Sequence, residues 1–228
     1  MRLPAFLLLL LLAAAAAAAD EGTDSSSLPD PEEFHRIVRE VMEGYPTDGS
    51  HAYWWPKGSK WAGNTRDLHY AGELFSAGDP QGRSYCCGLT FEVFFRSWEA
   101  WSRGHAVEFR IGDLDAAGLR AFRGRWFCSG DYRRGPVDAL VEAGLGTRIE
   151  TQADARRGDF IQLWRKNGSG HSVIFLRWET DGHGRRTGIR YWSTQPATDG
   201  IGARTESFEG ERGVVPEEIF IARAGGTE

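Results

Sequence analysis

The sequence predicts an α+β fold in one domain, with the helices first and an antiparallel sheet in the last third of the chain. Segments with apolar residues at helical spacing extend to about residue 143, and strand-length segments rich in Ile, Val, Phe and Trp follow from residue 159 onward. Neither an internal repeat nor a second domain boundary interrupts this order. Roughly 200 residues suffice for one domain with a full hydrophobic core.

The first residues have the features of a secretory signal peptide. Arg2 precedes an apolar run and a poly-Ala tract, which ends in small residues before Asp20. The apolar run is short for a membrane span, and about half of it is Ala. We therefore expect residues 1–19 to be a cleaved signal peptide, residues 20–29 a flexible acidic lead, and residues 30–228 a single domain that is secreted or periplasmic.

Charge and composition argue against several classes of function. The formal net charge is -5, and loss of residues 1–19 removes Arg2 as the only charged residue, which gives -6. A negative chain is poorly suited to general nucleic-acid binding. No second apolar stretch approaches spanning length, and neither a C-x-x-C pair nor an H-E-x-x-H sequence is present. We expect no nucleic-acid partner, no membrane span after signal removal, and no metal site.

The first helix is predicted to begin at Pro31, because Asp30 can cap it and two acids follow. Apolar residues at positions 34, 37, 38 and 41 form its buried stripe, and Gly44 ends it. An aromatic stretch, Tyr53 to Trp61, follows without clear periodicity. We interpret this stretch as a long loop pinned to the core by its Trp side chains. The alternative is an aromatic wall for a sugar or peptide ligand.

The middle of the chain predicts three more helices. One runs from Cys86 to about Trp101, one is capped by Asp113 or Asp115 and reaches Phe122, and one covers residues 136–143. A short strand is expected at 107–111. Five arginines lie at positions 120, 123, 125, 133 and 134. Such a cluster is more typical of a solvated surface than of a site for a carboxylate-bearing substrate.

The last third predicts an antiparallel meander. Its strands are expected at 159–164, 171–178, 189–195 and 218–222. The sequence Asp-Gly-His-Gly at 181–184 is predicted as the hairpin turn between the second and third strands.

Two of the three cysteines, Cys86 and Cys87, stand where a polar, Gly-rich loop enters the second helix. Unpaired backbone N–H groups and the positive end of the helix dipole stabilise a thiolate there, which favours a nucleophile. A small buried thiol or a structural disulfide explains the same pair equally well. If two cysteines pair, one odd thiol is left.

A thiolate nucleophile needs a base and a group that orients the base. His171 is the best candidate, because it follows the turn at 166–170 and opens an apolar strand, which places it at a sheet end. A histidine on a surface loop is the alternative. On the next predicted strand Tyr191, Ser193 and Gln195 share one face. If the two strands pair, Gln195 or Ser193 can hydrogen-bond the imidazole and fix its tautomer.

Three motifs occur in a fixed order along the chain. Residues 85–89 read Tyr-Cys-Cys-Gly-Leu at a helix start, residues 158–161 read Gly-Asp-Phe-Ile, and His171 then opens an apolar strand. This set resembles the NlpC/P60 superfamily of papain-like cysteine peptidases and amidases, which includes the CHAP branch and carries D-C-S-G-[FL], G-D-[LF]-[VI] and a strand-opening histidine. The resemblance covers about residues 65 to 195. Tyr85 departs from it by replacing the acid.

The resemblance implies a papain-like fold of the NlpC/P60 type, with the nucleophile helix packed on the antiparallel sheet. It places Cys86 on the family's nucleophile, Cys87 on the serine that follows, and His171 on the base. Gln195 stands in the third position, where the family has His or Asn. Backbone N–H groups near the two cysteines, with Tyr70 from the preceding aromatic-Gly segment, would stabilise the oxyanion.

The implied activity is that of an exported cysteine hydrolase that cleaves an amide or peptide bond through a thioester acyl-enzyme and needs no cofactor. Its implied substrate is a peptide or peptidoglycan-like molecule, such as cell-wall peptide. Two alternatives stay open: a non-catalytic glycan- or peptide-binding module on the same fold, and a thiol acyltransferase. The cysteine pairing also stays open. A Cys87–Cys128 disulfide would leave Cys86 free, whereas a Cys86–Cys128 disulfide would favour Cys87 as the nucleophile.

Overall fold

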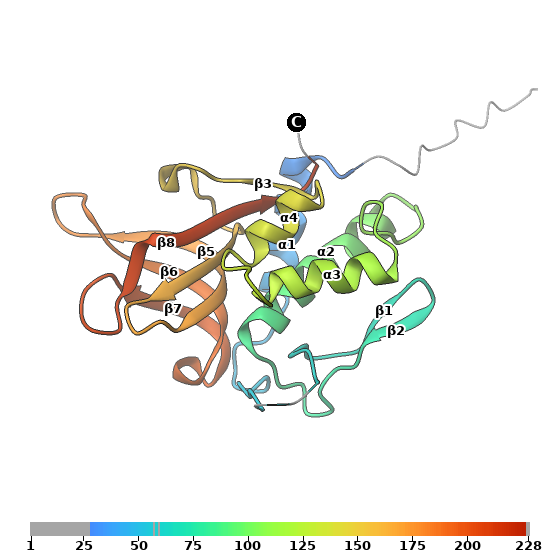
Figure 1. The fold of residues 1–228 in the computed structure, drawn as a ribbon, viewed down its shortest axis with the longest axis horizontal. Coiled ribbons are helices and arrows are strands. Elements are labelled where there is room, and N and C mark those ends of the chain that lie inside the picture. Colours follow the sequence, from blue (N-terminus) through green and yellow to red (C-terminus); the bar gives the residue numbers. More distant parts are fainter. Residues whose placement is uncertain (1–27, 57, 59, 227–228) are drawn as a thin grey trace, which may run out of the picture.

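The helices and the main sheet form two adjoining parts of the molecule, as Figure 1 shows. The computed structural model describes residues 28–56, 58 and 60–226. The predicted signal peptide and most of the predicted lead therefore lie outside the described residues. Among the helices that are described, none is both long enough and apolar enough to cross a membrane.

The order of the elements confirms the α+β class. The helices are α1 (Pro31–Glu43), α2 (Cys86–Gly104), α3 (Ala116–Trp126) and α4 (Pro136–Glu142), with short 3-10 turns η1 (Gln152–Asp154) and η2 (Pro196–Thr198). The strands are β1 (Leu68–Tyr70), β2 (Glu73–Ser76), β3 (Gly146–Arg148), β4 (Phe160–Arg165), β5 (Gly170–Thr180), β6 (Arg186–Gln195), β7 (Gly200–Ser207) and β8 (Val214–Ala224). The strands β1 and β2 form a small sheet of their own.

The main sheet is antiparallel throughout and has the strand order β3-β8-β4-β5-β6-β7. The predicted meander is confirmed for β4, β5 and β6. The predicted strand at 218–222 is confirmed as part of β8, but its place in the meander is wrong, because β7 pairs with β6, while β8 crosses back to pair with β4. The sequence does not predict β7, because this strand contains Gly200 and Gly202 and exposes polar side chains.

Residues 107–111 do not form the predicted strand. The Ile111 N–H donates to the Tyr70 hydroxyl at 3.1 Å, and the Phe109 ring packs on the Phe95 ring of α2 with centroids 5.1 Å apart. The apolar alternation of this segment is therefore satisfied by packing against α2 and β1. The sequence also does not predict β1, β2 and β3, whose three or four residues are too few to show a period.

The helix α1 has the predicted start and the predicted buried stripe. Asp30 accepts a hydrogen bond from the Glu33 N–H at 2.9 Å, and Pro31 occupies the first turn. The buried Phe34 ring lies 5.3 Å from the Trp98 ring of α2, measured between centroids. The N-terminal helix is thus packed onto α2.

The Gly158-Asp159 motif has a structural role in the fold. Gly158 has a φ of 111°, and a Cβ at this position would lie 2.7 Å from His35 Nε2 in α1. The buried Asp159 carboxylate accepts hydrogen bonds from Arg156 N at 2.7 Å and from Arg223 Nε and Nη2 at 2.8 and 2.9 Å. The motif therefore lets α1 approach closely and ties the start of β4 to β8.

The core has one part on each face of the main sheet. Phe160 and Ile174 belong to the cluster that the sheet shares with the helices, to which α2 contributes a series of buried aromatic rings. Their strand neighbours Ile161 and Val173 belong to a second cluster, formed by the sheet and the segments that join its strands. This two-sided burial explains why β4 and β5 read as nearly continuous apolar runs.

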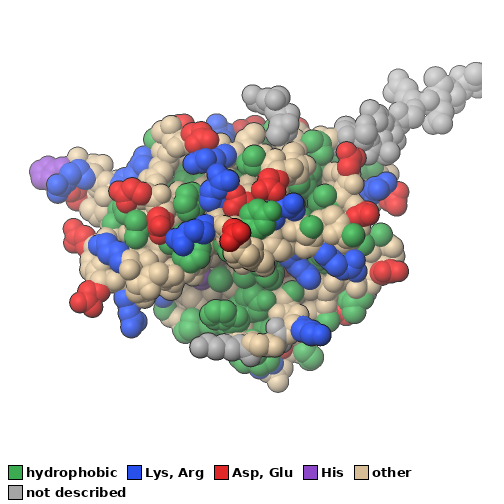
Figure 2. Space-filling model, viewed as in Figure 1, with side chains coloured by type: hydrophobic (Ala, Val, Ile, Leu, Met, Phe, Trp, Pro, Cys, Tyr) green, Lys and Arg blue, Asp and Glu red, His purple; other side chains and the backbone are tan. Residues whose placement is uncertain are grey.

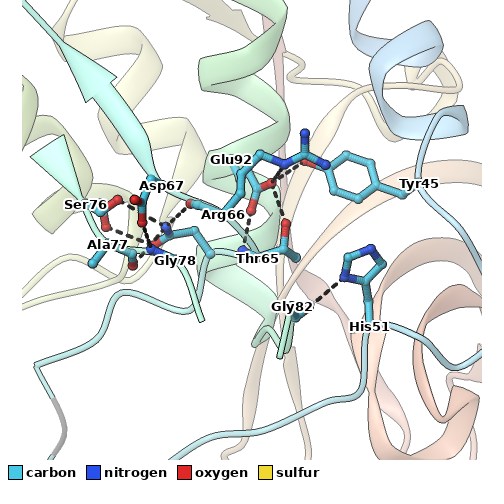
Figure 3. Close-up of polar contacts among 11 residues, drawn as sticks. Tyr45, His51, Thr65, Arg66, Asp67, Ser76, Ala77, Gly78, Gly82 and Glu92 are labelled. Atoms are coloured by element: carbon cyan, nitrogen blue, oxygen red, sulfur yellow. Dashed lines mark hydrogen bonds and ion pairs between the residues drawn. The ribbon is translucent and has the colours of Figure 1, made fainter. Parts of the chain in front are cut away.

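A buried carboxylate anchors the long loop that precedes α2 (Figure 3). Glu92, which is fully buried in α2, accepts hydrogen bonds from Tyr45 Oη at 2.7 Å, from Thr65 N at 2.6 Å and from Thr65 Oγ1 at 2.7 Å. The Arg66 Nε lies 3.5 Å from the same carboxylate. His51 Nδ1 lies 2.6 Å from the Gly82 carbonyl oxygen, which connects the loop to the segment before Cys86. Both ends of the loop are therefore fixed to α2.

A buried chain of hydrogen bonds joins α2 and α3 to the sheet. Trp126 Nε1 donates to Thr90 Oγ1 at 3.1 Å, and Thr90 Oγ1 lies 2.7 Å from Ser172 Oγ in β5. Ser193 Oγ in β6 donates to the Ser172 carbonyl oxygen at 2.8 Å. These four side chains are almost fully excluded from solvent. The chain therefore fixes the start of α2 relative to β5 and β6.

The substitution Thr90→Val is expected to lower the free energy of unfolding by about 1–3 kcal/mol, because it keeps the side-chain shape and leaves Trp126 Nε1 and Ser172 Oγ without their buried partner. Urea unfolding followed by tryptophan fluorescence measures this change. Combined with Ser172→Ala, it should cost less than the sum of the two single changes, because both remove the same bond. Additive losses would show that the two hydroxyls are not coupled.

Candidate active site

A cavity of about 680 Å³ lies where the start of α2 meets the first residues of β5. All three cysteines line it, together with His171 and Gln195. Its other lining residues include Tyr53, Trp55, Tyr85, Gln162, Trp164, Arg165 and Arg204. Figure 2 shows a hollow in the middle of this face, with hydrophobic side chains gathered in and below it. The structure thus brings together the cysteines, the histidine and the amide that the sequence analysis selects.

The helix α2 begins at the cavity with N–H groups that no side chain caps. Tyr85, the N-cap residue, is extended with φ -131° and ψ 164° and makes no capping hydrogen bond through its side chain. Cys86 and Cys87 are the first two residues of the helix, and both line the cavity. The first backbone donors and the positive end of the dipole are therefore placed to stabilise negative charge there.

Gly88 allows the preceding loop to lie directly on the first turn of α2. A Cβ at this position would lie 2.2 Å from the Ala62 carbonyl oxygen and 2.4 Å from the Gly63 carbonyl carbon. The Tyr85 N–H donates to the Gly63 carbonyl oxygen at 3.2 Å, and its hydroxyl donates to the Trp61 carbonyl oxygen at 2.9 Å. The glycine of the Cys-Cys-Gly sequence thus serves a close backbone approach.

His171 and Gln195 form a hydrogen-bonded pair, with His171 Nε2 and Gln195 Oε1 3.1 Å apart. Thr198 Oγ1 donates to the Gly200 carbonyl oxygen at 2.6 Å, so it accepts a hydrogen bond from Gln195 Nε2. This contact fixes the amide with its oxygen toward the imidazole. His171 Nε2 must then carry the proton, and Nδ1 is left to accept one. A base with this tautomer suits a neighbouring thiol.

Of the two candidates for the third residue, the geometry favours Gln195 over Ser193. The predicted pairing of the two strands is confirmed, with Ile174 of β5 opposite Trp192 of β6. The Ser193 hydroxyl is used elsewhere, because it donates to the Ser172 carbonyl oxygen. Ser193 therefore belongs to the buried chain beneath the site.

The environment separates the two adjacent thiols. The pKa of Cys86 is lowered well below its usual value by a hydrogen bond from Cys87, and the charge and hydrogen bonding of His171 and a backbone hydrogen bond from Ser172 act in the same direction against burial. The same hydrogen bond, together with burial, raises the pKa of Cys87 well above its usual value. Of the two thiols, Cys86 is thus the one whose thiolate the environment favours.

The third cysteine, Cys128, lies in the same cavity as a free thiol. Burial raises the pKa of Cys128 to about 11. Its backbone φ of 55° is unusual for a residue other than glycine. Cys86 and Cys87 are also free, so neither of the two disulfides considered from the sequence is formed in this structure.

Tyr70 does not reach the cavity, in contrast to its predicted place in the oxyanion site. Its hydroxyl donates to the Leu114 carbonyl oxygen at 2.6 Å and accepts from the Ile111 N–H, so it holds the irregular segment before α3. A different tyrosine, Tyr53, lines the cavity, and the pKa of Tyr53 is raised to about 12 by burial and by the electrostatic effect of the neighbouring Cys86 and Cys87. Only tertiary structure reveals this exchange, because a bridge to Ser84 brings Tyr53 beside the nucleophile helix.

The aromatic stretch at 53–61 has features both of a loop pinned to the core and of an aromatic wall for a ligand. Trp54 packs on Trp61 with centroids 5.3 Å apart and lies under the Arg83 guanidinium at 3.7 Å, as expected for a pinned loop. Trp55 is 61% exposed and lines the cavity, as expected for a ligand-binding wall. The loop therefore supplies part of the candidate site.

The cluster of five arginines is not part of the cavity lining. Arg120 and Arg123 lie over the Phe75 ring, Arg125 pairs with Glu142, Arg133 with Glu218, and Arg134 with Asp138. Contacts within the fold thus account for this cluster. The basic residues that do line the cavity, Arg165 and Arg204, and the amide of Gln162 are not predicted from the sequence. Gln162 alone leaves a signal, because it is a polar residue between apolar neighbours in β4.

Among the described residues, no group of three or more His, Cys, Asp or Glu side chains is arranged to hold a metal ion. Comparison of the chain with protein-family models, with curated proteins and with solved structures found no match. Functional conclusions therefore depend on the residues of this site and on the motifs in the sequence.

Iodoacetamide at neutral pH is expected to alkylate Cys86 selectively. The lowered pKa of Cys86 favours its thiolate at lower pH than that of Cys87 or Cys128, whose pKa values are raised, so Cys86 is expected to react first. Peptide mapping by mass spectrometry after brief exposure identifies the labelled residue, and His171→Ala should slow the labelling. Faster labelling of Cys87 than of Cys86 would reverse their assignment.

Proposed function

We propose that this chain is an exported cysteine hydrolase of the NlpC/P60 type, which cleaves an amide or peptide bond. The observation that supports this proposal most is the hydrogen-bonded pair of His171 and Gln195 in one cavity with the Cys86 thiol, whose pKa is lowered. A papain-like arrangement is part of the proposal, because α2 carries the nucleophile at its start and packs on the antiparallel sheet.

In acylation, His171 Nδ1 first accepts the proton of the Cys86 thiol, which leaves a thiolate beside an imidazolium. The Cys86 sulfur then bonds to the carbonyl carbon of the substrate, whose oxygen takes up the negative charge. Collapse of this intermediate breaks the C–N bond, and His171 gives its proton to the leaving amine. Gln195 holds the imidazole plane through both steps by accepting from Nε2.

Deacylation repeats the sequence with water in place of the thiol. His171 takes a proton from water, the hydroxide adds to the thioester carbonyl, and the Cys86 thiolate leaves as the carboxylic acid product forms. The uncapped N–H groups at the start of α2 are suited to stabilise the oxyanion in both stages. Tyr53 replaces Tyr70 as the nearby phenol donor, since burial keeps its hydroxyl protonated.

The substrate class in this proposal comes from the motifs and from the N-terminal sequence. Residues 85–89 and 158–161 resemble motifs of a superfamily that acts on cell-wall peptides, and residues 1–19 resemble a signal peptide. A peptide or peptidoglycan-like substrate outside the cytoplasm follows from the two together. The aromatic lining of the cavity is suited to such ligands, because flat rings pack on both peptide and sugar surfaces.

One observation favours a second candidate function, that of a binding module. The Trp55 ring is exposed and lines the cavity, where it can contact a ligand whether or not a reaction takes place. A binding module would retain ligand after Cys86→Ser and lose it after Trp55→Ala, with no product formed by the wild-type chain. A hydrolase forms product and loses turnover with Cys86→Ser.

Hydrolysis of muropeptides and of short peptide amides, followed by mass spectrometry, tests the proposal. The substitution Cys86→Ala is expected to lower kcat by at least about 1,000-fold, because it removes the group that forms the acyl-enzyme. Gln195→Ala should lower kcat by roughly 10- to 100-fold, because a misplaced imidazole still ionises the thiol. Acid quenching during turnover should trap a thioester on Cys86.

The matched control is Cys87→Ser, which keeps a small hydrogen-bond donor beside Cys86 and should retain turnover within about tenfold. Gln195→Glu keeps an acceptor for His171 Nε2 and should lose less than Gln195→Ala. An added amine separates hydrolysis from acyl transfer, because a transferase would convert the acyl group into a new amide. Turnover that survives Cys86→Ala and disappears in Cys87→Ser would contradict the assigned nucleophile.

A further inference from the structure

The candidate catalytic cavity has an aromatic part and a basic part. Tyr53, Trp55 and Trp164 supply aromatic rings, and Arg165 with Arg204 supplies positive charge. In the reaction proposed above, Tyr53 is an oxyanion donor, and the other four side chains have no chemical role. These side chains can therefore determine which substrate the cavity binds.

The basic part carries one positive charge in excess. Arg165 donates to the Glu206 carboxylate from Nε at 2.7 Å and from Nη2 at 2.8 Å, and Tyr191 Oη donates to Glu206 Oε1 at 2.6 Å. Arg204 approaches the same Oε1 with its Nε at 3.3 Å. Two guanidinium groups thus share one buried carboxylate, which already accepts three other hydrogen bonds. Glu206 neutralises only one of them.

Arg204 is the arginine whose N–H donors remain available to a ligand. Nε is the Arg204 nitrogen nearest to Glu206, and the Arg204 side chain donates no hydrogen bond to the described residues. The side chain is 38% exposed, whereas the Arg165 side chain is 16% exposed. A guanidinium held through Nε presents its two terminal N–H groups in a planar fork, which matches the two oxygens of a carboxylate.

The position of Arg204 relative to the catalytic pair is fixed by the sheet. It lies opposite Tyr191 in the pairing of β6 with β7, and the Tyr191 ring contacts the His171 ring with centroids 5.4 Å apart. One side chain therefore separates Arg204 from the base. A ligand group at Arg204 would lie several atoms along the substrate from the bond that Cys86 attacks.

A second cavity of about 520 Å³ adjoins the first at this point, and Arg165, Ser169 and Arg204 line both. Its further lining includes Arg212 and Glu209. The catalytic cavity thus opens at its basic part into a polar space. A substrate can extend past Arg204 while its reacting carbonyl stays beside Cys86.

We propose that Arg204 is a specificity-determining residue, which binds a carboxylate of the substrate while the aromatic part of the cavity receives an apolar group. This inference rests on the proposed function and narrows its substrate to amides that carry an acidic group a few atoms from the cleaved bond. Glu206 orients Arg204 and Arg165 and leaves the charge of one guanidinium for the ligand.

Isothermal titration of the Cys86→Ser protein with a matched pair of ligands tests the proposal without turnover. The probes are N-acetyl-leucyl-glutamate and its diamide, N-acetyl-leucyl-glutamine amide, which share shape and differ in charge. The dicarboxylate is expected to bind at least about 10-fold more tightly, because only a carboxylate can accept two charge-assisted hydrogen bonds from the planar guanidinium. In Cys86→Ser with Arg204→Gln this preference should fall below about twofold, with the affinity for the diamide unchanged.

Two further variants separate a specific contact from general attraction. Arg204→Lys keeps the charge and loses the planar fork, so it should retain only part of the preference. Arg212→Gln removes the same charge from the second cavity alone and should leave the preference intact. Equal affinity for the two ligands, no binding of either, or a preference that survives Arg204→Gln would each overturn the proposal. If the protein prefers the dicarboxylate but the wild-type chain shows no turnover, the proposed hydrolase activity is contradicted and the role of Arg204 in binding stands.

Discussion

The candidate site depends on one hydrogen-bonded contact between α2 and the sheet. Thr90 Oγ1 lies 2.7 Å from Ser172 Oγ, and both side chains are fully or nearly fully buried. Thr90 stands one helical turn after Cys86, and Ser172 directly follows His171. Because α2 and β5 are rigid elements, a bond one turn below the thiol also fixes the thiol relative to the imidazole. The Trp126 N–H and the Ser193 hydroxyl complete this chain, so a misplaced thiol would require breaking several buried bonds.

The helix α2 also positions the aromatic side of the cavity, through the buried carboxylate of Glu92. Burying a carboxylate is costly unless hydrogen bonds compensate it, and Glu92 receives them from Tyr45 and Thr65, at the two ends of the loop that carries Tyr53 and Trp55. A loop of this length loses much conformational entropy when it is ordered. Fixing its ends to the helix that begins with Cys86 reduces the freedom of the aromatic side chains between them. The same helix, α2, thus positions both the thiols and the aromatic rings of the cavity.

The features that the sequence predicts are those with a local signal. The cap at Asp30, the apolar spacing of α2 and the apolar runs of β4 to β6 depend on neighbours in the chain, and the structure has all of them. Alternation within β6 also places Gln195 on the face of His171. The presence of Tyr53 in place of Tyr70 in the cavity lining and the position of Arg204 on β7 depend on contacts between distant segments. Neither leaves a period in the sequence, and residues 107–111 show that an apolar alternation can be satisfied by helix packing in place of a strand partner.

Two adjacent thiols at one helix start cannot be equivalent, and the reason is geometric. Successive helical residues point about 100° apart, so only one of the two can face a base fixed on the neighbouring strand. His171 and the backbone of Ser172 act on Cys86, which favours its thiolate. Hydrogen bonding to Cys86, burial and repulsion by an ionised neighbour all raise the pKa of Cys87. The two thiols therefore favour opposite charge states, with the negative charge favoured at Cys86 and opposed at Cys87.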